Sequence, residues 1–94
     1  MEIKLSESDS NGRFYMSDKG KTLAEMSWVK GSDSYIIVDH TMVSDALKGQ
    51  GIGKMLLEKM VELARRRNIK IMPLCPFVKS VFDKTSEYAD LYYK

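Results

Sequence analysis

The apolar side chains of this sequence repeat every two residues before Gly51 and with helical spacing after it. Alternation by two is typical of strands that bury one face, whereas apolar residues at i, i+3 and i+4 indicate an amphipathic helix. Four strand-like segments come first, at residues 3–6, 13–17, 22–29 and 35–43. The helix begins after Gly51 and ends at Arg65-Arg66-Arg67, with Asn68 as a left-handed C-terminal residue. Strands joined by short turns must therefore precede one long helix.

Three glycine-containing segments separate these strands. Asn11-Gly12 is typical of a type I′ hairpin turn, and further turns are expected at residues 18–20 and 30–33. Such turns make consecutive strands antiparallel, whereas the helix is long enough for a right-handed crossover to a parallel strand at 69–74. Pro76 opens a second, shorter helix. We predict an α/β (α+β) fold whose mixed, mostly antiparallel sheet has the order β-β-β-β-α-β-α.

Composition narrows the class of protein. A chain of 94 residues with 44% apolar and 30% charged residues is expected to form one domain over 1–94. One cysteine and one histidine are too few for a disulfide framework or for a zinc site of the Cys/His type, so no metal is expected. A net charge of +2 favours neither nucleic acid nor an anionic membrane as partner. With a free thiol and no apolar export signal, we expect a cytoplasmic protein.

The remaining three glycines crowd into one loop between a predicted strand and the long helix. It reads Lys48-Gly49-Gln50-Gly51-Ile52-Gly53-Lys54. Alternate glycines allow close backbone approach, and the N–H groups of a first helical turn attract phosphate. The alternative is a loop that merely needs positive φ. A Walker loop would need Gly at 48 and Ser or Thr at 55, and a dinucleotide fingerprint would need Gly at 54 or 56, so neither nucleotide class is expected.

This loop resembles the pyrophosphate loop, [Gln/Arg]-x-x-Gly-x-[Gly/Ala], of the GNAT superfamily of N-acetyltransferases. Lys48 stands where that superfamily usually has Gln or Arg. Residues 40–43 and 73–77 are also similar to the very small, stand-alone GNAT-like proteins of the YjdJ type. The resemblance covers roughly residues 35–88. It implies that acetyl-coenzyme A is the cofactor and that the chain is an enzyme of the N-acetyltransferase class.

The resemblance also implies how coenzyme A is held. The strands at 35–43 and 69–74 would splay, so that the pantetheine arm bonds to backbone groups of Met42 and Val43. The loop N–H groups of Gln50, Gly51, Ile52, Gly53 and Lys54 would hold the pyrophosphate, with positive charge from Lys48 and Lys54. Gly49 belongs to the same cofactor-binding loop.

Transfer to an amine requires a neutral nucleophile, and an amine with a pKa near 10.4 is almost entirely protonated at pH 7. His40 is the only histidine, the residue type used most often as a base at neutral pH, and it is expected on the same strand face as Met42. It is a candidate base. The alternative is a partly buried strand histidine satisfied by a hydrogen bond.

Cys75 is the second catalytic candidate. It ends the fifth strand and precedes a helix begun by Pro76, whose N-terminus favours a thiolate. The resemblance places it where many GNAT proteins have a pantetheine-binding Asn. It could accept the acetyl group as a thioester, form a mixed disulfide with coenzyme A, or pack as a small hydrophobe. Phe82 matches the tyrosine that protonates the departing thiolate in many relatives, so that proton must come from elsewhere, such as Cys75 or water.

The sequence thus favours transfer of an acetyl group from acetyl-coenzyme A to an amine, on a small molecule or exposed on a protein, by a monomer or weak homodimer. One alternative is a non-catalytic coenzyme A binder or thiol sensor. Another is a small RNA-binding domain acting through residues 65–70.

Overall fold

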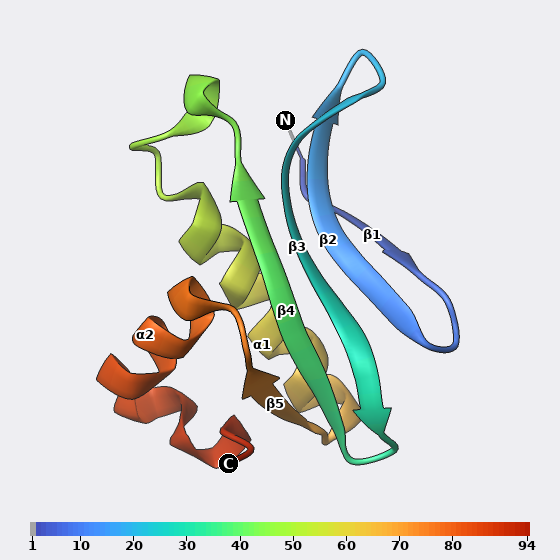
Figure 1. Ribbon diagram of the computed structural model, residues 1–94, viewed down its shortest axis with the longest axis vertical. Coiled ribbons are helices and arrows are strands. Elements are labelled where there is room, and N and C mark those ends of the chain that lie inside the picture. Colours follow the sequence, from blue (N-terminus) through green and yellow to red (C-terminus); the bar gives the residue numbers. More distant parts are fainter. Residues whose placement is uncertain (1) are drawn as a thin grey trace.

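The computed structural model describes residues 2–94 and arranges them as a twisted sheet with helices against one face (Figure 1). The elements in chain order are β1 Lys4–Glu7, β2 Asn11–Asp18, β3 Lys21–Ser32, β4 Tyr35–Val43, the 3₁₀ helix η1 Asp45–Leu47, α1 Ile52–Arg67, β5 Lys70–Pro73, α2 Pro76–Lys84 and the 3₁₀ helix η2 Ser86–Leu91. This confirms the predicted order of strands and helices.

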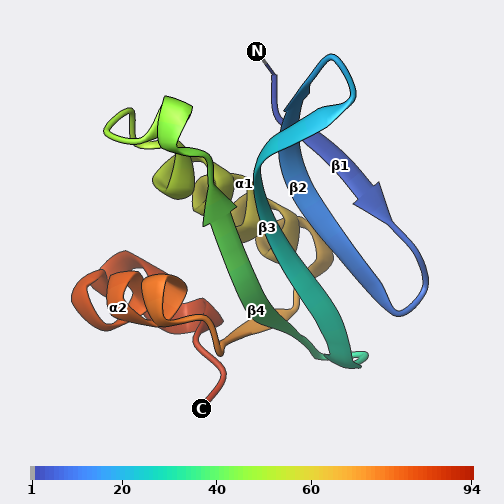
Figure 2. The same cartoon turned by 45° about the horizontal axis from the view of Figure 1, so that its top comes forward.

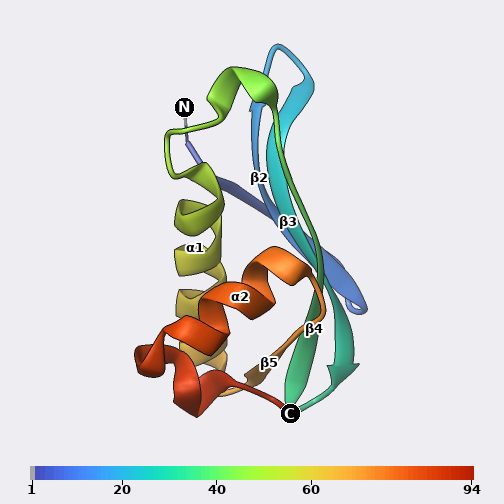
Figure 3. The same cartoon turned by 60° about the vertical axis from the view of Figure 1, so that its left-hand side comes forward.

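The sheet has the spatial order β1-β2-β3-β4-β5. The first four strands are antiparallel neighbours, and β5 is parallel to β4 after the crossover through α1. Figure 3 shows α1 and α2 on the same side of the sheet. The outer face of the sheet, opposite these helices, carries no helix among the residues described. The prediction of a mixed, mostly antiparallel sheet is therefore confirmed.

The core lies between α1 and the inner face of the sheet. Its strand residues recur with a period of two, and its α1 residues form one continuous stripe. The buried α1 side chains are Ile52, Leu56, Leu57, Met60, Val61, Leu63 and Ala64. The i, i+3, i+4 spacing from Ile52 predicts Met55 in this stripe, but Met55 is 42% exposed, whereas Leu57 and Val61 are buried. The buried stripe is therefore rotated from the predicted one.

Turns join these strands as predicted, but two of the three do not contain the predicted glycine. Asn11 and Gly12 lie within β2 without positive φ, and the turn spans residues 8–10, where the Ser8 N–H donates to the Asn11 carbonyl at 2.8 Å. Gly31 likewise lies within β3. A Cβ at Gly12 would collide with the Trp28 ring, and one at Gly31 with the Tyr35 ring. Each glycine makes room for an aromatic ring.

The hairpin turn between β2 and β3 is where the sequence predicts it. Lys19 and Gly20 have φ values of 52° and 79°, the positive values that a type I′ turn requires at both central positions. Asn68 ends α1 with a φ of 56°, so the predicted left-handed C-terminus is also confirmed.

Strands β4 and β5 separate halfway along β4. They pair from Tyr35↔Lys70 to Val38↔Pro73, after which the N–H groups of Leu74 and Cys75 both donate to the Val38 carbonyl at 3.0 Å. Residues 40–43 of β4 pair with β3 but with no other strand in the described part of the chain. The register slips at Asp39, and such a bulge strengthens local twist and bends a strand away from its neighbour. The edge of β4 is therefore open where the resemblance implies a splay.

The three consecutive arginines that end α1 are each paired with an acidic side chain. The pairs are Arg65–Asp90 at 3.1 Å, Arg66–Glu62 at 3.0 Å and Arg67–Glu7 at 2.6 Å. The first links α1 to η2 and the last links it to the edge strand β1. These two ion pairs connect the C-terminal end of α1 to the neighbouring elements.

Within residues 2–94, no helix is long and apolar enough to cross a membrane. The same residues contain no group of three or more His, Cys, Asp or Glu side chains placed to hold a metal ion.

The Glu7–Arg67 pair should make stability depend on pH in acid. Two hydrogen bonds from the Arg67 guanidinium, at 2.6 and 2.9 Å, hold the pKa of Glu7 below 4.5. A carboxyl whose pKa is lower in the folded state stabilises above its unfolded pKa, and this contribution is lost as pH falls through the folded pKa. We expect Glu7→Gln to lower the free energy of unfolding at pH 7 by about 0.5–1 kcal/mol, since the pair is partly exposed.

Urea unfolding of wild type and Glu7→Gln at a series of pH values tests this. The difference between the two proteins should shrink below about pH 5 and vanish below the folded pKa of Glu7. Glu58→Gln, on the exposed face of α1, is the control and should show no such dependence. If the free energies of unfolding of wild type and Glu7→Gln differed by the same amount at every pH, the Glu7–Arg67 pair would not be the cause of the difference.

Candidate functional site

A groove of about 420 Å³ lies between the end of β4, the glycine loop and the first turns of both helices. Figure 2 shows this end of the molecule, with η1 and the following loop connecting β4 to α1. The lining residues are Thr41, Val43, Leu47, Lys48, Gly49, Gly51, Ile52, Gly53, Lys54 and Phe77. The open edge of β4 and the start of α1 thus belong to one site.

The loop presents backbone N–H groups to this groove. Gly49 and Gly51 have φ values of 83° and 73°, and a Cβ at either would meet nothing within 4 Å. Gly51 is the N-cap of α1 and makes no side-chain capping bond. No hydrogen bond in the described part of the chain uses the N–H groups of residues 49–54. A row of free N–H groups at a helix N-terminus fits an anion such as pyrophosphate.

Gly53 serves a different purpose from the other two glycines of the loop. It lies inside α1 without positive φ, and a Cβ there would come within 3.1 Å of Phe77 Cζ in α2. The missing side chain therefore lets the Phe77 ring lie close to the first turn of α1. The loop contains both features that the sequence left as alternatives: positions that need positive φ and a cradle of unpaired N–H groups.

The two lysines of the loop differ in their surroundings. Lys48 Nζ lies 2.8 Å from Asp45 Oδ1, in a pair whose side chains are 67% and 93% exposed. Such an exposed pair is weak and easily exchanged. Lys54 lines the groove and forms no ion pair within residues 2–94. Both can add positive charge beside the N–H groups.

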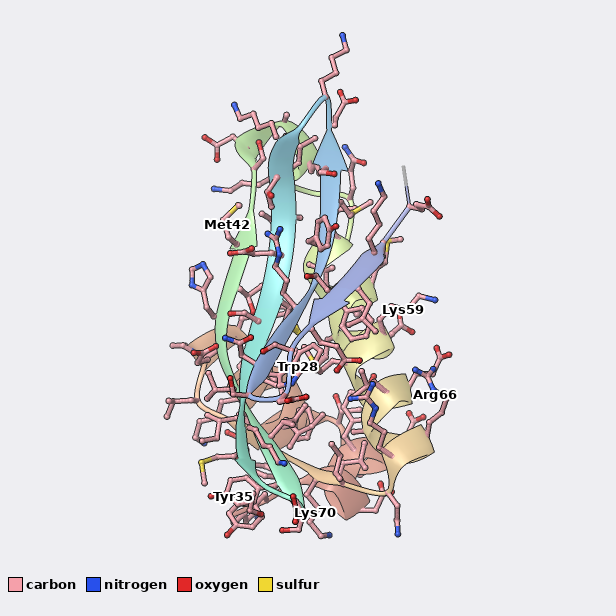
Figure 4. All side chains as sticks on the ribbon, turned by 90° about the vertical axis from the view of Figure 1, so that its right-hand side faces the viewer. Trp28, Tyr35, Met42, Lys59, Arg66 and Lys70 are labelled. Carbon is pink, nitrogen blue, oxygen red and sulfur yellow. The ribbon has the colours of Figure 1, made fainter. Side chains whose placement is uncertain are left out.

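Residues at the end of β4 divide between the two faces of the sheet. Thr41 and Val43 line the groove on the helix side. Met42, which pairs with Glu25, lies on the outer face, and Figure 4 shows it on the side of the sheet away from α1. Along the open edge, backbone groups of alternate residues point away from β3. An extended ligand can bond to these groups as an added strand does.

Cys75 is the N-cap residue of α2 and is buried. Its Sγ donates a hydrogen bond to Thr41 Oγ1 at 3.3 Å. Thr41 lines the groove, so the thiol lies within hydrogen-bond distance of a residue of the groove wall. The structure thus puts Cys75 beside the groove, at the point where β4 and β5 separate.

His40 lies on the opposite face. Its side chain is 58% exposed, and its Nε2 is 3.8 Å from Glu25 Oε2. The other oxygen of Glu25 accepts a hydrogen bond from Arg13 at 2.7 Å. The outer face also carries a cavity of about 470 Å³, with Arg13, Glu25 and Asp39 in its lining. The two catalytic candidates, His40 and Cys75, are therefore not brought together, because their side chains lie on different faces of the sheet.

The structure separates the residues singled out in the sequence into two groups. Those that line the groove are Val43, Lys48, Gly49, Gly51, Ile52, Gly53 and Lys54, whereas His40, Met42, Gln50 and Cys75 do not line it. Sequence reasoning missed Thr41, Leu47 and Phe77. Strand alternation places Thr41 on the same face as Val43, so the sequence did contain a signal that Thr41 lines the groove. No local sequence pattern indicates that Phe77 of α2 lies against Gly53 of α1.

Comparison with known proteins gives one family and several related folds. The family profile described as GCN5-related N-acetyl-transferase matches residues 13–91. The solution structure of a GCN5-like protein from Staphylococcus aureus, a proposed N-acetyltransferase, is 38% identical over 96% of this chain and 87% of that one, with a TM-score of 0.75. Among curated proteins, a search found no significant match.

Two further structures share the fold at lower identity. A ribosomal-protein-alanine N-acetyltransferase from Brucella melitensis biovar Abortus 2308 is 18% identical over 82% of this chain and 62% of that one, with a TM-score of 0.63. A GNAT family acetyltransferase from Elizabethkingia anophelis, solved with acetyl-CoA bound, is 15% identical over 68% of this chain and 42% of that one, with a TM-score of 0.58. The chain spans less than two thirds of either protein.

Proposed function

This chain belongs to the GCN5-related N-acetyltransferase family, and on that premise we propose that its groove binds acetyl-coenzyme A and that the protein transfers the acetyl group to an amine. The observation that carries the proposal is the set of unpaired N–H groups of residues 49–54 at the start of α1. They suit a pyrophosphate in charge and in hydrogen-bonding capacity. A related fold that holds acetyl-CoA supports the choice of ligand.

The pyrophosphate and the pantetheine arm of the ligand each have a matching part of the site. The N–H groups from Gln50 to Lys54 hold the pyrophosphate, and Lys48 and Lys54 supply positive charge. The pantetheine arm follows the open edge of β4 at Met42 and Val43 and takes the place of an additional strand. Acetyl-coenzyme A supplies the activated acyl group.

The two candidate catalytic side chains take separate steps, since they lie on separate faces. Cys75 accepts the acetyl group at its thiol, forming one thioester as the other breaks. Exposed His40 takes a proton from the ammonium group of the acceptor on the outer face. The neutral amine then attacks that acetyl group, the carbon–sulfur bond to Cys75 breaks, and the proton released by the amine restores the thiol. Direct transfer without acetylation of Cys75 is the alternative that the experiment below distinguishes.

The acceptor reaches the site from the outer face of the sheet. Residues 8–10 and 19–20, which join β1, β2 and β3, are short turns that build no cover over this face. An exposed amine on a protein, or a small amine held at a weak dimer contact, suits such an open site better than a deeply enclosed substrate.

Thermal unfolding with acetyl-CoA, CoA, ATP and NAD in parallel tests the proposal. At about 100 times Kd, a ligand adds roughly 2.7 kcal/mol, which raises the midpoint of a domain of this size by about 10 °C or more. We expect this shift with the two coenzyme A species alone. No shift with either species would overturn the proposal.

Intact mass after incubation with acetyl-CoA then separates the chemical routes. We expect wild type to gain one acetyl group and Cys75→Ala to gain none. Transfer to amines by a protein that is never acetylated would support the direct route. Binding without transfer to a broad panel of amines would instead support a non-catalytic coenzyme A binder.

A further inference from the structure

We propose that Thr41 is a positioning residue for Cys75 and that its hydroxyl carries the proton of the thiol during acetylation. The proposal rests on the proposed function, because it concerns the step in which Cys75 accepts the acetyl group. Its structural basis is the hydrogen bond from Cys75 Sγ to Thr41 Oγ1 at 3.3 Å. No other hydrogen bond of either side chain occurs in the part of the chain described.

Both partners of this contact are held by rigid elements. Thr41 pairs with Met26 in the antiparallel ladder of β3 and β4, just beyond the bulge at Asp39. Cys75 caps α2, and its N–H is fixed to the Val38 carbonyl at 3.0 Å. As a β-branched residue in a strand, threonine has restricted χ1 freedom, which keeps its hydroxyl directed. The sequence separation of 34 residues is thus bridged by a well-defined contact.

The threonine hydroxyl is the link between the buried thiol and the groove. Thr41 lines the groove, and Cys75 contacts its hydroxyl while only 6% of the cysteine surface is exposed. A hydroxyl has one proton to donate and lone pairs to accept another. While the oxygen accepts from Cys75, its own proton remains available to the groove side.

The reaction requires such a link, because a thiol must lose its proton to become a nucleophile and the departing thiolate benefits from gaining one. Phe82 has no proton to give, and it is buried against the rings of Tyr88 and Tyr92, each with a centroid 5.4 Å away. Neither it nor exposed His40 on the other face can serve the Cys75 thiol.

The step balances without any further reagent. The bond from Cys75 Sγ to the acetyl carbon forms, and the original bond from sulfur to that carbon breaks. The Cys75 proton passes to Thr41 Oγ1 as the hydroxyl proton passes to the departing thiolate. One proton therefore moves from one sulfur to the other, and Thr41 ends as it began.

Thr41→Val and Thr41→Ser form a matched pair for the test. Valine keeps the branched shape and removes the hydroxyl, whereas serine keeps the hydroxyl and removes a methyl group. Mixed with acetyl-CoA and sampled by intact mass, Thr41→Val should acquire its acetyl group about 100-fold more slowly than wild type, as expected for loss of one proton-transfer group. Thr41→Ser should restore most of the rate. Both variants should keep the thermal shift with CoA, since the N–H groups of residues 49–54 are untouched.

A second readout needs no acetyl-CoA. Alkylation of Cys75 by iodoacetamide should be several-fold slower in Thr41→Val than in wild type and close to wild type in Thr41→Ser. Equal alkylation and equal acetylation in the two variants would overturn the role of Thr41 while leaving the proposed function intact. A wild-type protein that shifts with CoA yet gains no acetyl group would overturn the proton relay alone, whereas the absence of any shift would overturn the proposed function.

Discussion

Replacing Gly51 with glutamate is expected to abolish the thermal stabilisation of this protein by acetyl-CoA and CoA. Gly51 is exposed, has a φ of 73° and caps α1, and a Cβ there would meet nothing within 4 Å. The new side chain therefore has room in the loop and places a carboxylate beside the N–H groups of residues 52–54. It competes for those donors and repels a phosphate at close range. We expect a loss of affinity of at least about 100-fold, equivalent to roughly 2.7 kcal/mol.

Gly20→Glu provides the matched control. Gly20 has a φ of 79°, and a Cβ there would also meet nothing within 4 Å, but it lies in the turn between β2 and β3, outside the groove. Both substitutions carry the same backbone cost of a non-glycine residue with positive φ, about 1 kcal/mol. Gly20→Glu should therefore lower the midpoint of the unliganded protein slightly and keep the full shift with acetyl-CoA. A Gly51→Glu protein that still shifts by about 10 °C would show that the pyrophosphate lies elsewhere.

The glycine loop could be predicted from sequence because its chemistry is local. Positive φ at Gly49 and Gly51, unpaired N–H groups and the start of α1 all arise within seven consecutive residues. Helix α1 and strand β4 were predictable for a similar reason, since each has a clear hydrophobic period. The sheet order followed from short connections and one helical crossover.

Contacts between distant segments could not be predicted in this way. The hydrogen bond from Cys75 to Thr41 depends on where β5 leaves β4, which is next to a bulge at Asp39 that has no signature in the sequence. His40 is separated from Cys75 by strand alternation: Thr41 faces Cys75, and its neighbour His40 faces the other side of the sheet. His40 and Cys75, both catalytic candidates from the sequence, are therefore assigned to different steps of the proposed reaction.

Glycine was the least reliable signal because it has two uses. It permits positive φ, as at Gly20, and it makes room for a neighbouring group, as at Gly12 and Gly31. Asn11-Gly12 is a typical hairpin pair, yet Gly12 lies directly opposite Trp28 in the ladder of β2 and β3. The aromatic partner, not a turn, requires the missing side chain. The sequence gives no means of pairing Gly12 with Trp28 until the register is known.

This distinction leads to the second large expected effect, which concerns stability. Gly12→Ala should lower the free energy of unfolding by about 2 kcal/mol and the melting midpoint by roughly 10 °C. The new Cβ would collide with Cζ2 and Cη2 of Trp28, a side chain with only 4% of its surface exposed, which packs against Phe14 with ring centroids 5.8 Å apart. Because the ring is enclosed, it cannot move aside without disturbing the core.

A double-mutant cycle with Trp28→Phe separates steric crowding from backbone strain. Phenylalanine lacks Cζ2 and Cη2, so Gly12→Ala should cost less in that background, where the contact of the new Cβ with Glu7 Cβ at 2.9 Å remains. Urea unfolding of the four proteins gives the coupling energy. If Gly12 instead occupied a hairpin turn with positive φ, alanine would cost the same in both backgrounds. Equal costs would thus refute the β2–β3 register, and with it the placement of β4 on which both the groove and the Thr41–Cys75 contact depend.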